Sequence, residues 1–392
     1  MKSLNGAIMQ TKLIIVGGGA AGIVCALTAK RENPSLQVSI LEQNERIGKK
    51  ILKTGNGKCN LSNLNMSEHF YNHPHELSIW LNQIPISEVQ AFFQSCGLFL
   101  KTDGSTRLYP YSEQATTVLE VLRYELKRHH IDTICNVRVK SLIYEQGWIV
   151  KTNQRDFKAD YVVVASGSLA QEQTEGYRIL QELGHRLIPL VPGLAALKTK
   201  EKLRHLQGLR VKCQAGIYEQ KRLLHQDKGE ILFKDDGLSG ILAFDLSRFL
   251  TKGNEVALDL LFDYPHLERE LTSLLTWKEL EDALMGLLPK MLVWEILKRN
   301  PNRDIKAIVK TIHHLSFEVV ATYGFEWAQI ARGGISLEDI NLDFSSRKQA
   351  HLSIIGEVLD VDGASGGYNL HFAWLSGMIA GRAIASFEKN GK

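Results

Sequence analysis

The strongest constraint on the fold lies in residues 12–42, where an apolar run, a glycine-rich turn and a helical segment follow one another. The run KLIIV at 12–16 has the composition of a buried parallel strand. It leads into GGGAAG at 17–22 and then into IVCALTAKR, whose apolar positions suit one face of a helix. A strand, a G-x-G-x-x-G turn and a helix in this order predict a Rossmann-type unit that binds a dinucleotide.

The three glycines and a downstream carboxylate have separate roles in such a unit. Gly17 permits the tight turn, Gly19 lets the backbone reach a pyrophosphate, and Gly22 lets helix and strand pack closely. The second strand, VSIL at 38–41, ends in Glu42, 20 residues beyond Gly22. A carboxylate at this place accepts both hydroxyls of an adenosine ribose and repels a 2′-phosphate. The pattern predicts the adenine half of the ligand and leaves NAD and FAD open.

The segment after Glu42 favours FAD over NAD. An NAD enzyme normally continues with another helix and strand, whereas residues 48–63 read GKKILKTGNGKCNLSN. Such a polar loop can run beside an extended ligand, because glycines allow close approach of the backbone. We interpret Gly48, Gly55 and Gly57 as clearance, Lys49 and Lys50 as phosphate partners, and Asn56 and Asn60 as hydrogen-bonding partners of a ring system.

Later segments return to the same sheet. Residues 160–165 form an apolar run followed by Ser166-Gly167-Ser168, a pattern typical of strands that pass beneath a dinucleotide. Residues 351–355 predict a strand, 356–367 a loop with Glu357, Asp360 and Asp362, and 368 onward a helix. Gly366 and Gly367 leave the start of this helix without side chains, so its partial positive charge can face a ligand such as a reduced flavin.

Composition limits the class of protein. The chain has 392 residues, 44% of them hydrophobic, and a net charge of +4 from 47 basic and 43 acidic residues spread along its length. This balance gives no argument for nucleic acid. Five widely spaced cysteines without a C-x-x-C pair predict neither disulfides nor a zinc site, and no apolar stretch approaches the length of a bilayer span. We therefore expect a cytoplasmic protein with no membrane partner and no metal.

The expected fold class is α/β, with a Rossmann-like domain that is split in the sequence. We predict its first part at 1–190 and its second part at 329–392. The two prolines in LIPLVPGLAAL mark the start of an inserted domain at 191–328. The insert is expected to contain strands over 194–262 and helices over 265–320, and to supply substrate contacts.

Several segments together resemble one family of bacterial flavoproteins. GGGAAG at 17–22, Glu42, the loop 48–63, ARGGISLEDIN at 331–341 and GEVLDVDGASGGYNLHFAWLSGMIAG at 356–381 are similar to the BaiN-like (YhiN-like) family, essentially from end to end. The resemblance implies non-covalent FAD, a two-part FAD domain and an inserted domain of strands followed by helices. Two segments depart from the family pattern: Lys234-Asp235-Asp236 replaces a frequent Thr-His pair, and Ser168 replaces a glycine.

Carried over by position, the resemblance implies a cofactor site that runs from the ribose to the flavin. Glu42 would bind the ribose, Val139 the adenine, and Gly17, Gly19, Ala21, Gly22 and Gly167 the pyrophosphate. Lys50, Gly55, Gly57, Asn60 and Leu61 would lie along the dinucleotide. Glu357, Asp360, Gly367, Tyr368 and Asn369 would reach the ribityl and ring end, and the neighbouring Ala20, Gln43, Ala165 and Gly356 complete the predicted site.

Three functions stay open at this stage. We favour an oxidase that takes a hydride from a small amine, amino ketone or amino acid and passes electrons to O2, giving H2O2, because no second nucleotide fingerprint is present. The alternatives are an NAD(P)H-dependent reductase of an enone-type small molecule and a non-catalytic flavin-binding protein. Lys53, Lys58 and Tyr368 are the catalytic candidates, whereas Cys59, without a partner cysteine, is assigned to packing rather than redox chemistry. Substrate identity and oligomeric state are left open.

Overall fold

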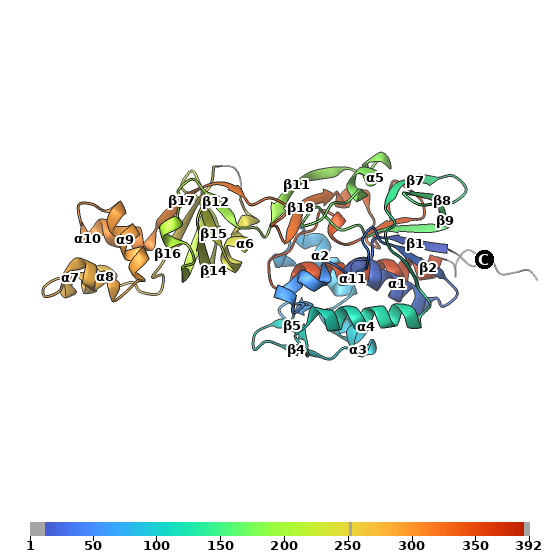
Figure 1. Cartoon of the computed structure of the whole chain (residues 1–392), viewed down its shortest axis with the longest axis horizontal. Coiled ribbons are helices and arrows are strands. Elements are labelled where there is room, and N and C mark those ends of the chain that lie inside the picture. Colours follow the sequence, from blue (N-terminus) through green and yellow to red (C-terminus); the bar gives the residue numbers. More distant parts are fainter. Residues whose placement is uncertain (1–11, 251–252, 388–392) are drawn as a thin grey trace, which may run out of the picture. The chain divides into compact units, whose positions relative to one another are not determined.

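The computed structural model describes residues 12–250 and 253–387 (Figure 1). Two compact units divide the chain. The first takes the described residues of Met1–Val191 and Ile330–Lys392, and the second is Pro192–Gln329. The sequence predicts an inserted domain at 191–328, within one residue of these bounds at each end.

A parallel five-stranded sheet forms the centre of the first unit (Figure 1). Its strand order is β19-β10-β1-β2-β6, with bounds β1 Lys12–Val16, β2 Gln37–Leu41, β6 Asp132–Ile134, β10 Tyr161–Val164 and β19 Leu352–Ile354. Val16 pairs with Leu41 on one side and with Val164 on the other. All carboxyl ends therefore meet at one edge of the sheet, which is where open α/β sheets bind their ligands. This confirms the Rossmann-like α/β class.

Two helices from opposite ends of the chain pack together on this sheet. These are α1, Ala20–Glu32, and α11, Tyr368–Phe387. A Cβ atom at Gly377 would lie 2.5 Å from the carbonyl oxygen of Ala21, and one at Gly381 would lie 2.8 Å from that of Cys25. The two backbones can approach this closely because both positions lack side chains. The contact joins the amino-terminal and carboxy-terminal parts of the sequence into one domain.

A long excursion separates β2 from β6. It contains η1 Ile51–Gly57, β3 Ser62–Asn63, η2 Glu68–Phe70, α2 Pro74–Gln83, α3 Ile86–Ser95, β4 Leu100–Thr102, β5 Arg107–Pro110 and α4 Ala115–Arg128. Strands β3, β5 and β4 form a small sheet of their own. The third parallel strand on this side of the sheet thus arrives only after the excursion.

The other elements of the first unit are short. Strands β7 Val139–Tyr144, β8 Trp148–Thr152 and β9 Phe157–Ala159 form an antiparallel sheet, and β11 Leu187–Gly193 pairs with β18 Ile330–Ile335. The first unit also contains α5 Gly176–Glu182, η4 Leu337–Asp339 and η5 Gly356–Val358. The chain leaves the first unit along β11 and re-enters it at β18.

The second unit is a closed six-stranded barrel followed by helices. The strand order is β12-β15-β14-β13-β16-β17, with bounds β12 Leu197–Thr199, β13 Arg210–Glu219, β14 Arg222–Lys234, β15 Gly237–Ser239, β16 Glu255–Asp259 and β17 Leu315–Thr322. Helical elements are η3 Arg204–Leu206, α6 Ile241–Ser247, α7 Leu267–Leu274, α8 Leu280–Met285, α9 Lys290–Arg299 and α10 Ile305–His313. Leu197, Ile217, Phe233 and Phe317 are buried in its core.

The predicted helical segment 265–320 is wrong at its end. Residues 315–322 form β17, which pairs with β16 and β12 and closes the barrel. Leu315, Phe317 and Val319 alternate with more exposed residues, which is the two-residue period of a strand. Four helices rich in leucine or isoleucine precede this segment, and their pattern concealed the change of period.

No helix within residues 12–250 and 253–387 combines the length and apolar character that a membrane crossing needs.

Candidate cofactor groove

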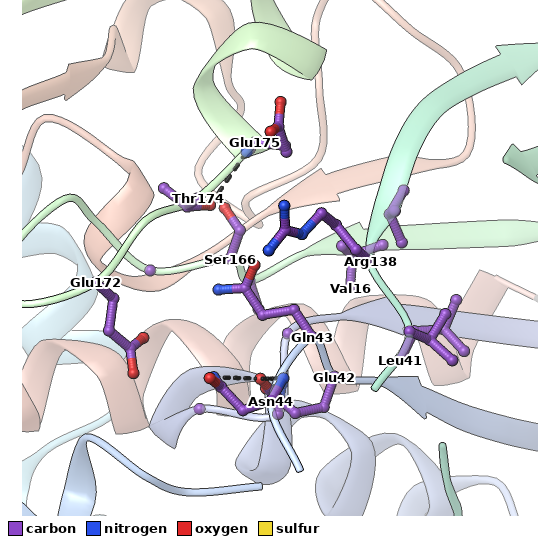
Figure 2. A pocket seen from close by; sticks show the side chains of 18 of the residues that line it. Val16, Leu41, Glu42, Gln43, Asn44, Arg138, Ser166, Glu172, Thr174 and Glu175 are labelled. Carbon is purple, nitrogen blue, oxygen red and sulfur yellow. Dashed lines mark hydrogen bonds between the residues drawn. The ribbon is translucent and has the colours of Figure 1, made fainter. Parts of the chain in front are cut away.

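A pocket lies at the carboxyl edge of the parallel sheet (Figure 2). Its empty volume, including open solvent at the mouth, is about 680 Å³. Its lining comes from the ends of β1, β2 and β10 and from the segments that follow them: Val16, Gly17, Gly18, Gly19, Leu41, Glu42, Gln43, Asn44, Gly48, Lys49, Lys50, Val137, Arg138, Val139, Ala165, Ser166, Gly167, Glu172, Thr174, Glu175, Gly176 and Ile179. Predicted residues at the ribose, adenine and pyrophosphate ends therefore line one pocket.

The glycine-rich turn is shaped to bring backbone amides to this pocket. A Cβ atom at Gly22 would lie 2.1 Å from the carbonyl oxygen of Gly17, so helix α1 and the turn could not pack as they do with a side chain there. A Cβ at Gly19, in contrast, would meet no atom within 4 Å. Helix α1 begins here without a side-chain cap. Its first N–H groups and its positive dipole end thus face open space, which suits a pyrophosphate.

Glu42 is held in one orientation directly beside the glycine-rich turn. Its Oε2 accepts a hydrogen bond from the Gly18 amide at 2.8 Å, and its Oε1 accepts from the backbone and side-chain amides of Asn44 at 2.8 and 2.7 Å (Figure 2). The residue is buried. An ionised carboxylate offers about four lone-pair positions. Acceptor capacity therefore remains on Oε2 for a ribose hydroxyl.

The segment between β10 and α5 adds polar groups to the wall. The Ser166 hydroxyl is buried and has no hydrogen-bond partner in the described part of the chain, and a Cβ at Gly176 would lie 1.9 Å from it. Thr174 accepts a hydrogen bond from the Gly176 amide (Figure 2). Burial raises the pKa of the Glu172 carboxyl, while Lys50, Lys49 and Lys53 act in the opposite direction. The groove thus combines uncapped amides with lysines, and these groups fit a phosphate-bearing ligand.

A second polar cluster lies beyond the pocket, on the loop after β19. Its members come from three segments that are far apart in the sequence. His73 Nε2 lies 3.2 Å from Asp360 Oδ2, and Asn72 Oδ1 accepts from the Asp362 amide at 2.9 Å. Arg332, on β18, lies 4.0 Å from Asp362. The pKa of His73 is raised, chiefly by its hydrogen bond to Asp360.

The sequence matches the family described as "HI0933-like protein Rossmann domain" over residues 11–383. The chain belongs to this family. It is 35% identical to the 3-dehydro-bile acid delta(4,6)-reductase of Clostridium scindens, over 96% of this chain and 99% of that protein. It is 27% identical to the ribosomal RNA dihydrouridine synthase of Haemophilus influenzae, over 95% of this chain and 98% of that protein. The open form of a flavocytochrome c3 fumarate reductase shares the fold, with a TM-score of 0.50 and 16% identity, covering 97% of this chain and 79% of that one. The protein is accordingly an FAD-dependent oxidoreductase, as the resemblance implied.

Family membership indicates how FAD would lie along the groove. With its ribose beside Glu42, after β2, and its pyrophosphate at α1, after β1, an extended FAD would send its flavin toward β10 and β19. Gly356 follows β19 and stands next to α1, since a Cβ there would lie 2.8 Å from that of Ala21. Glu357 then forms an ion pair with Lys50 at 2.7 Å. We therefore expect the flavin end at residues 356–367 and the cluster around them.

Five predicted residues of the polar loop do not line the pocket. Gly55, Asn56 and Gly57 have positive φ angles and lie exposed at the loop tip, whereas Leu61 is buried. Asn60 is also buried; its Oδ1 has no partner among the described residues, and a Cβ at Gly367 would come within 2.9 Å of it. Asn60 and Gly367 thus lie side by side, while the loop tip stands apart from the pocket.

Predicted side chains at the flavin end are largely engaged with protein groups. Both carboxylate oxygens of Asp360 have partners, in His73 and Asn72. Asn369 accepts from the Gly363 amide at 2.7 Å and donates to the carbonyl of the same residue at 2.8 Å. These side chains hold the loop together, and their contact with FAD stays a prediction.

The catalytic candidates are not gathered in one place. Lys53 donates to Gln171 Oε1 at 3.2 Å, and Lys58 pairs with Glu113 at 2.7 Å on the surface. Tyr368 is buried, stacks on Phe70 with ring centroids 4.4 Å apart, and donates to the carbonyl of Asn65. Burial raises the pKa of the Cys59 thiol to about 12, so it is a neutral packing group. A catalytic role for Lys53, Lys58 or Tyr368 stays a prediction.

Sequence reasoning missed part of the pocket wall. The missed residues are Gly18, Asn44, Val137, Arg138, Ser166, Glu172, Thr174, Glu175, Gly176 and Ile179, while Gly48 and Lys49 were noted only as part of the loop. Gly18 and Asn44 adjoin predicted residues in the sequence, and this adjacency is a signal from which they could have been found. The stretch 172–176 follows no motif and enters the wall because the chain turns back over the sheet edge before α5.

Another buried polar group lies at the first turn of α11. His371 is fully buried and its Nδ1 lies 2.8 Å from the Ser62 hydroxyl, while its Nε2 has no partner among the described residues. Burial lowers the pKa of His371 to about 4. The ring is therefore neutral and ties α11 to β3; it is no source of protons near neutral pH.

Proposed function

We propose that the protein uses FAD to reduce a carbon–carbon double bond conjugated with a carbonyl group in a small molecule. The proposal rests on one observation above others: the groove described here belongs to a chain 35% identical, over nearly its whole length, to a named delta(4,6)-reductase of a 3-dehydro-bile acid. That name describes double bonds in conjugation with a 3-oxo group. An enone is also the substrate type of the reductase considered from the sequence.

The reaction divides between cofactor and protein. Bound FAD supplies hydride chemistry at its N5 atom. The chain must hold the cofactor, receive the carbonyl oxygen as charge develops on it, and deliver a proton to the carbon next to the carbonyl. Lys50, Glu42 and the amides of the glycine-rich turn would serve the first task.

His73 is the candidate for the proton. Its ring is half-buried, and its raised pKa, caused mainly by the hydrogen bond to Asp360, favours the protonated form toward neutral pH. Glu76 and Asp362 act in the same direction. A general acid works best when its pKa lies near the working pH. Asp360 lies on the loop after β19, where we expect the flavin, and His73 reaches it from the start of α2.

A second candidate substrate is a uridine in RNA. The relative from Haemophilus influenzae is named a ribosomal RNA dihydrouridine synthase. Saturation of the uracil 5,6 double bond, which is conjugated with the 4-carbonyl, is the same reaction on another substrate. This candidate departs from the expectation that nucleic acid is no partner.

The oxidase favoured by the sequence is the competing reaction. It would draw electrons from an amine, amino ketone or amino acid and pass them to O2. Both curated relatives are instead named for reactions that add hydrogen to a substrate, and this supports the reductase.

The test is product analysis under anaerobic conditions with FAD and NADPH. We expect cyclohexenone, as a simple enone, to be converted to cyclohexanone. A uridine-containing fragment of ribosomal RNA in a parallel reaction distinguishes the second candidate, by the mass gain of two hydrogens. Absence of both products, with NADPH consumed only when air is admitted, would reject the proposed reductase.

A further inference from the structure

Arg332 is a partly buried arginine of the first unit whose Nε donor is unused. It lies in β18, where its side chain is 29% exposed. Its Nε is buried and has no hydrogen-bond partner within residues 12–250 and 253–387. The nearest carboxylate is Asp362, whose Oδ2 lies 4.0 Å from Nε, beyond hydrogen-bond distance. A partly buried cation in this state carries a desolvation cost that its protein neighbours do not offset.

Structural arginines in the same chain look different. Arg31 contacts Glu125 at 2.7 Å and also reaches Ser95 and Cys96. Arg299, in the second unit, contacts Glu295 at 2.7 Å and donates to the Ser316 carbonyl at 2.7 Å. An arginine that serves packing thus closes its hydrogen bonds here. Arg332 does not, which suggests that its partner is a molecule other than the protein.

The strand that carries Arg332 runs along the expected flavin end. The Ala331 amide donates to Glu357 Oε1 at 3.3 Å, and the Asp360 amide donates to the Ile335 carbonyl at 2.9 Å. A Cβ at Gly334 would lie 2.6 Å from the carbonyl carbon of Leu359, so the strand and the loop are in close contact. Arg332 therefore belongs to the same wall as Glu357 and Asp360.

The charges around Arg332 leave it available. Glu357 is paired with Lys50, and Asp360 with His73. Asp362 is buried beside the guanidinium and keeps it in place electrostatically, without a direct hydrogen bond. A planar fork of N–H donors next to a proton source is the arrangement that a conjugated carbonyl or carboxylate needs.

We propose that Arg332 binds the carbonyl or carboxylate oxygen of the substrate, the oxygen conjugated with the double bond that is reduced. This inference rests on the proposed function for the identity of the ligand. The guanidinium donates hydrogen bonds to the oxygen and stabilises the negative charge that it acquires when hydride adds to the far carbon of the double bond. The proton then goes to the near carbon of the double bond, which is bonded to the carbonyl or carboxylate carbon, so that two electrons and two hydrogens are added in total.

The test measures ligand binding to the oxidised, FAD-loaded protein, apart from turnover. Cinnamate, an α,β-unsaturated carboxylate, is titrated by calorimetry into the wild type and into Arg332→Gln, Arg332→Lys and Arg155→Gln. Arg155 is an exposed arginine and serves as the matched control. Loss of charged hydrogen bonds predicts on the order of 10- to 100-fold weaker cinnamate binding for Arg332→Gln, and a smaller loss for Lys. Arg155→Gln should bind as the wild type does.

Each result has a defined meaning. Flavin absorbance and thermal unfolding show that every variant is folded and loaded. Equal cinnamate affinity in wild type and Arg332→Gln, or a wild type that does not bind cinnamate, overturns the role of Arg332. Cyclohexenone turnover that is lost in Arg332→Gln, together with weakened cinnamate binding, supports it. An absence of enone turnover in the wild type, with cinnamate binding still dependent on Arg332, would instead reject the proposed function and retain the anion site.

Discussion

Replacing Glu42 by alanine should weaken FAD binding by a predictable amount. The change removes the acceptors of three protein hydrogen bonds, from the Gly18 amide and from two amides of Asn44. It also removes the proposed acceptor for the ribose hydroxyls. A hydrogen bond to a charged group contributes about 1.5–3 kcal/mol. Loss of one such bond to the ribose predicts a dissociation constant roughly 10- to 100-fold higher.

A matched variant separates charge from shape. Glu42→Gln keeps the size of the side chain, but its amide NH2 must face either the Gly18 amide or those of Asn44, and each of these is a donor. We expect Glu42→Gln to lie between wild type and Glu42→Ala. Apo-protein is titrated with FAD and the quenching of flavin fluorescence is followed, while thermal unfolding with and without FAD reports folding. Unchanged FAD affinity in a folded Glu42→Ala protein would refute the ribose role.

Three further predictions follow from other contacts. We expect the reduction rate to fall as pH rises through the raised pKa of His73; His73→Gln should remove this fall, and Asp360→Asn should move it to lower pH. The His73–Asp360 pair stabilises the fold fully below the pKa of His73 in the unfolded chain, and this stabilisation is lost as pH rises through the raised pKa of the folded state. An unaltered pH–rate profile in both variants would exclude this ring as the proton source. Gly377→Val should lower the free energy of unfolding, measured in urea, by about 1–3 kcal/mol, because its Cβ would lie 2.5 Å from a backbone oxygen of α1. Gly104→Ala is the control: Gly104 is exposed and a Cβ there meets no atom within 4 Å, so this variant reports only the strain of a positive φ angle. Lys58→Met should leave kcat/KM nearly unchanged, since Lys58 is a surface partner of Glu113; a loss of 100-fold or so would instead restore it as a catalytic group.

The sequence was most informative where backbone geometry is specified by residue type. The order strand, G-x-G-x-x-G, helix predicted the turn correctly because Gly17 and Gly22 stand where any side chain would strike the backbone. Gly377 and Gly381 likewise stand where a side chain would strike the backbone of α1, although α1 lies at the other end of the chain. Such local constraints are written into the sequence, while the identity of a distant partner is not.

Other features depend on contacts that no local pattern encodes. Strand β17 was mistaken for helix because its closing role in the barrel is defined by β12 and β16, not by neighbouring residues. Arg332 stands in the segment ARGGISLEDIN, whose sequence indicates no role for it, because only the structure shows that its Nε has no partner among the described residues. Lys58 looked chemically active in the sequence, yet Glu113, which comes from another segment, accounts for its charge.

The fate of the electrons on the reduced flavin tests the proposed reductase activity most directly. FAD-loaded protein is reduced anaerobically and mixed in a stopped-flow instrument with cyclohexenone, with the uridine-containing RNA fragment, or with air-saturated buffer. We predict that the enone, or the RNA if uridine is the substrate, reoxidises the flavin faster than air does and yields the saturated product. Fast reoxidation by air with formation of H2O2, and none by either acceptor, would contradict the reductase and support the oxidase.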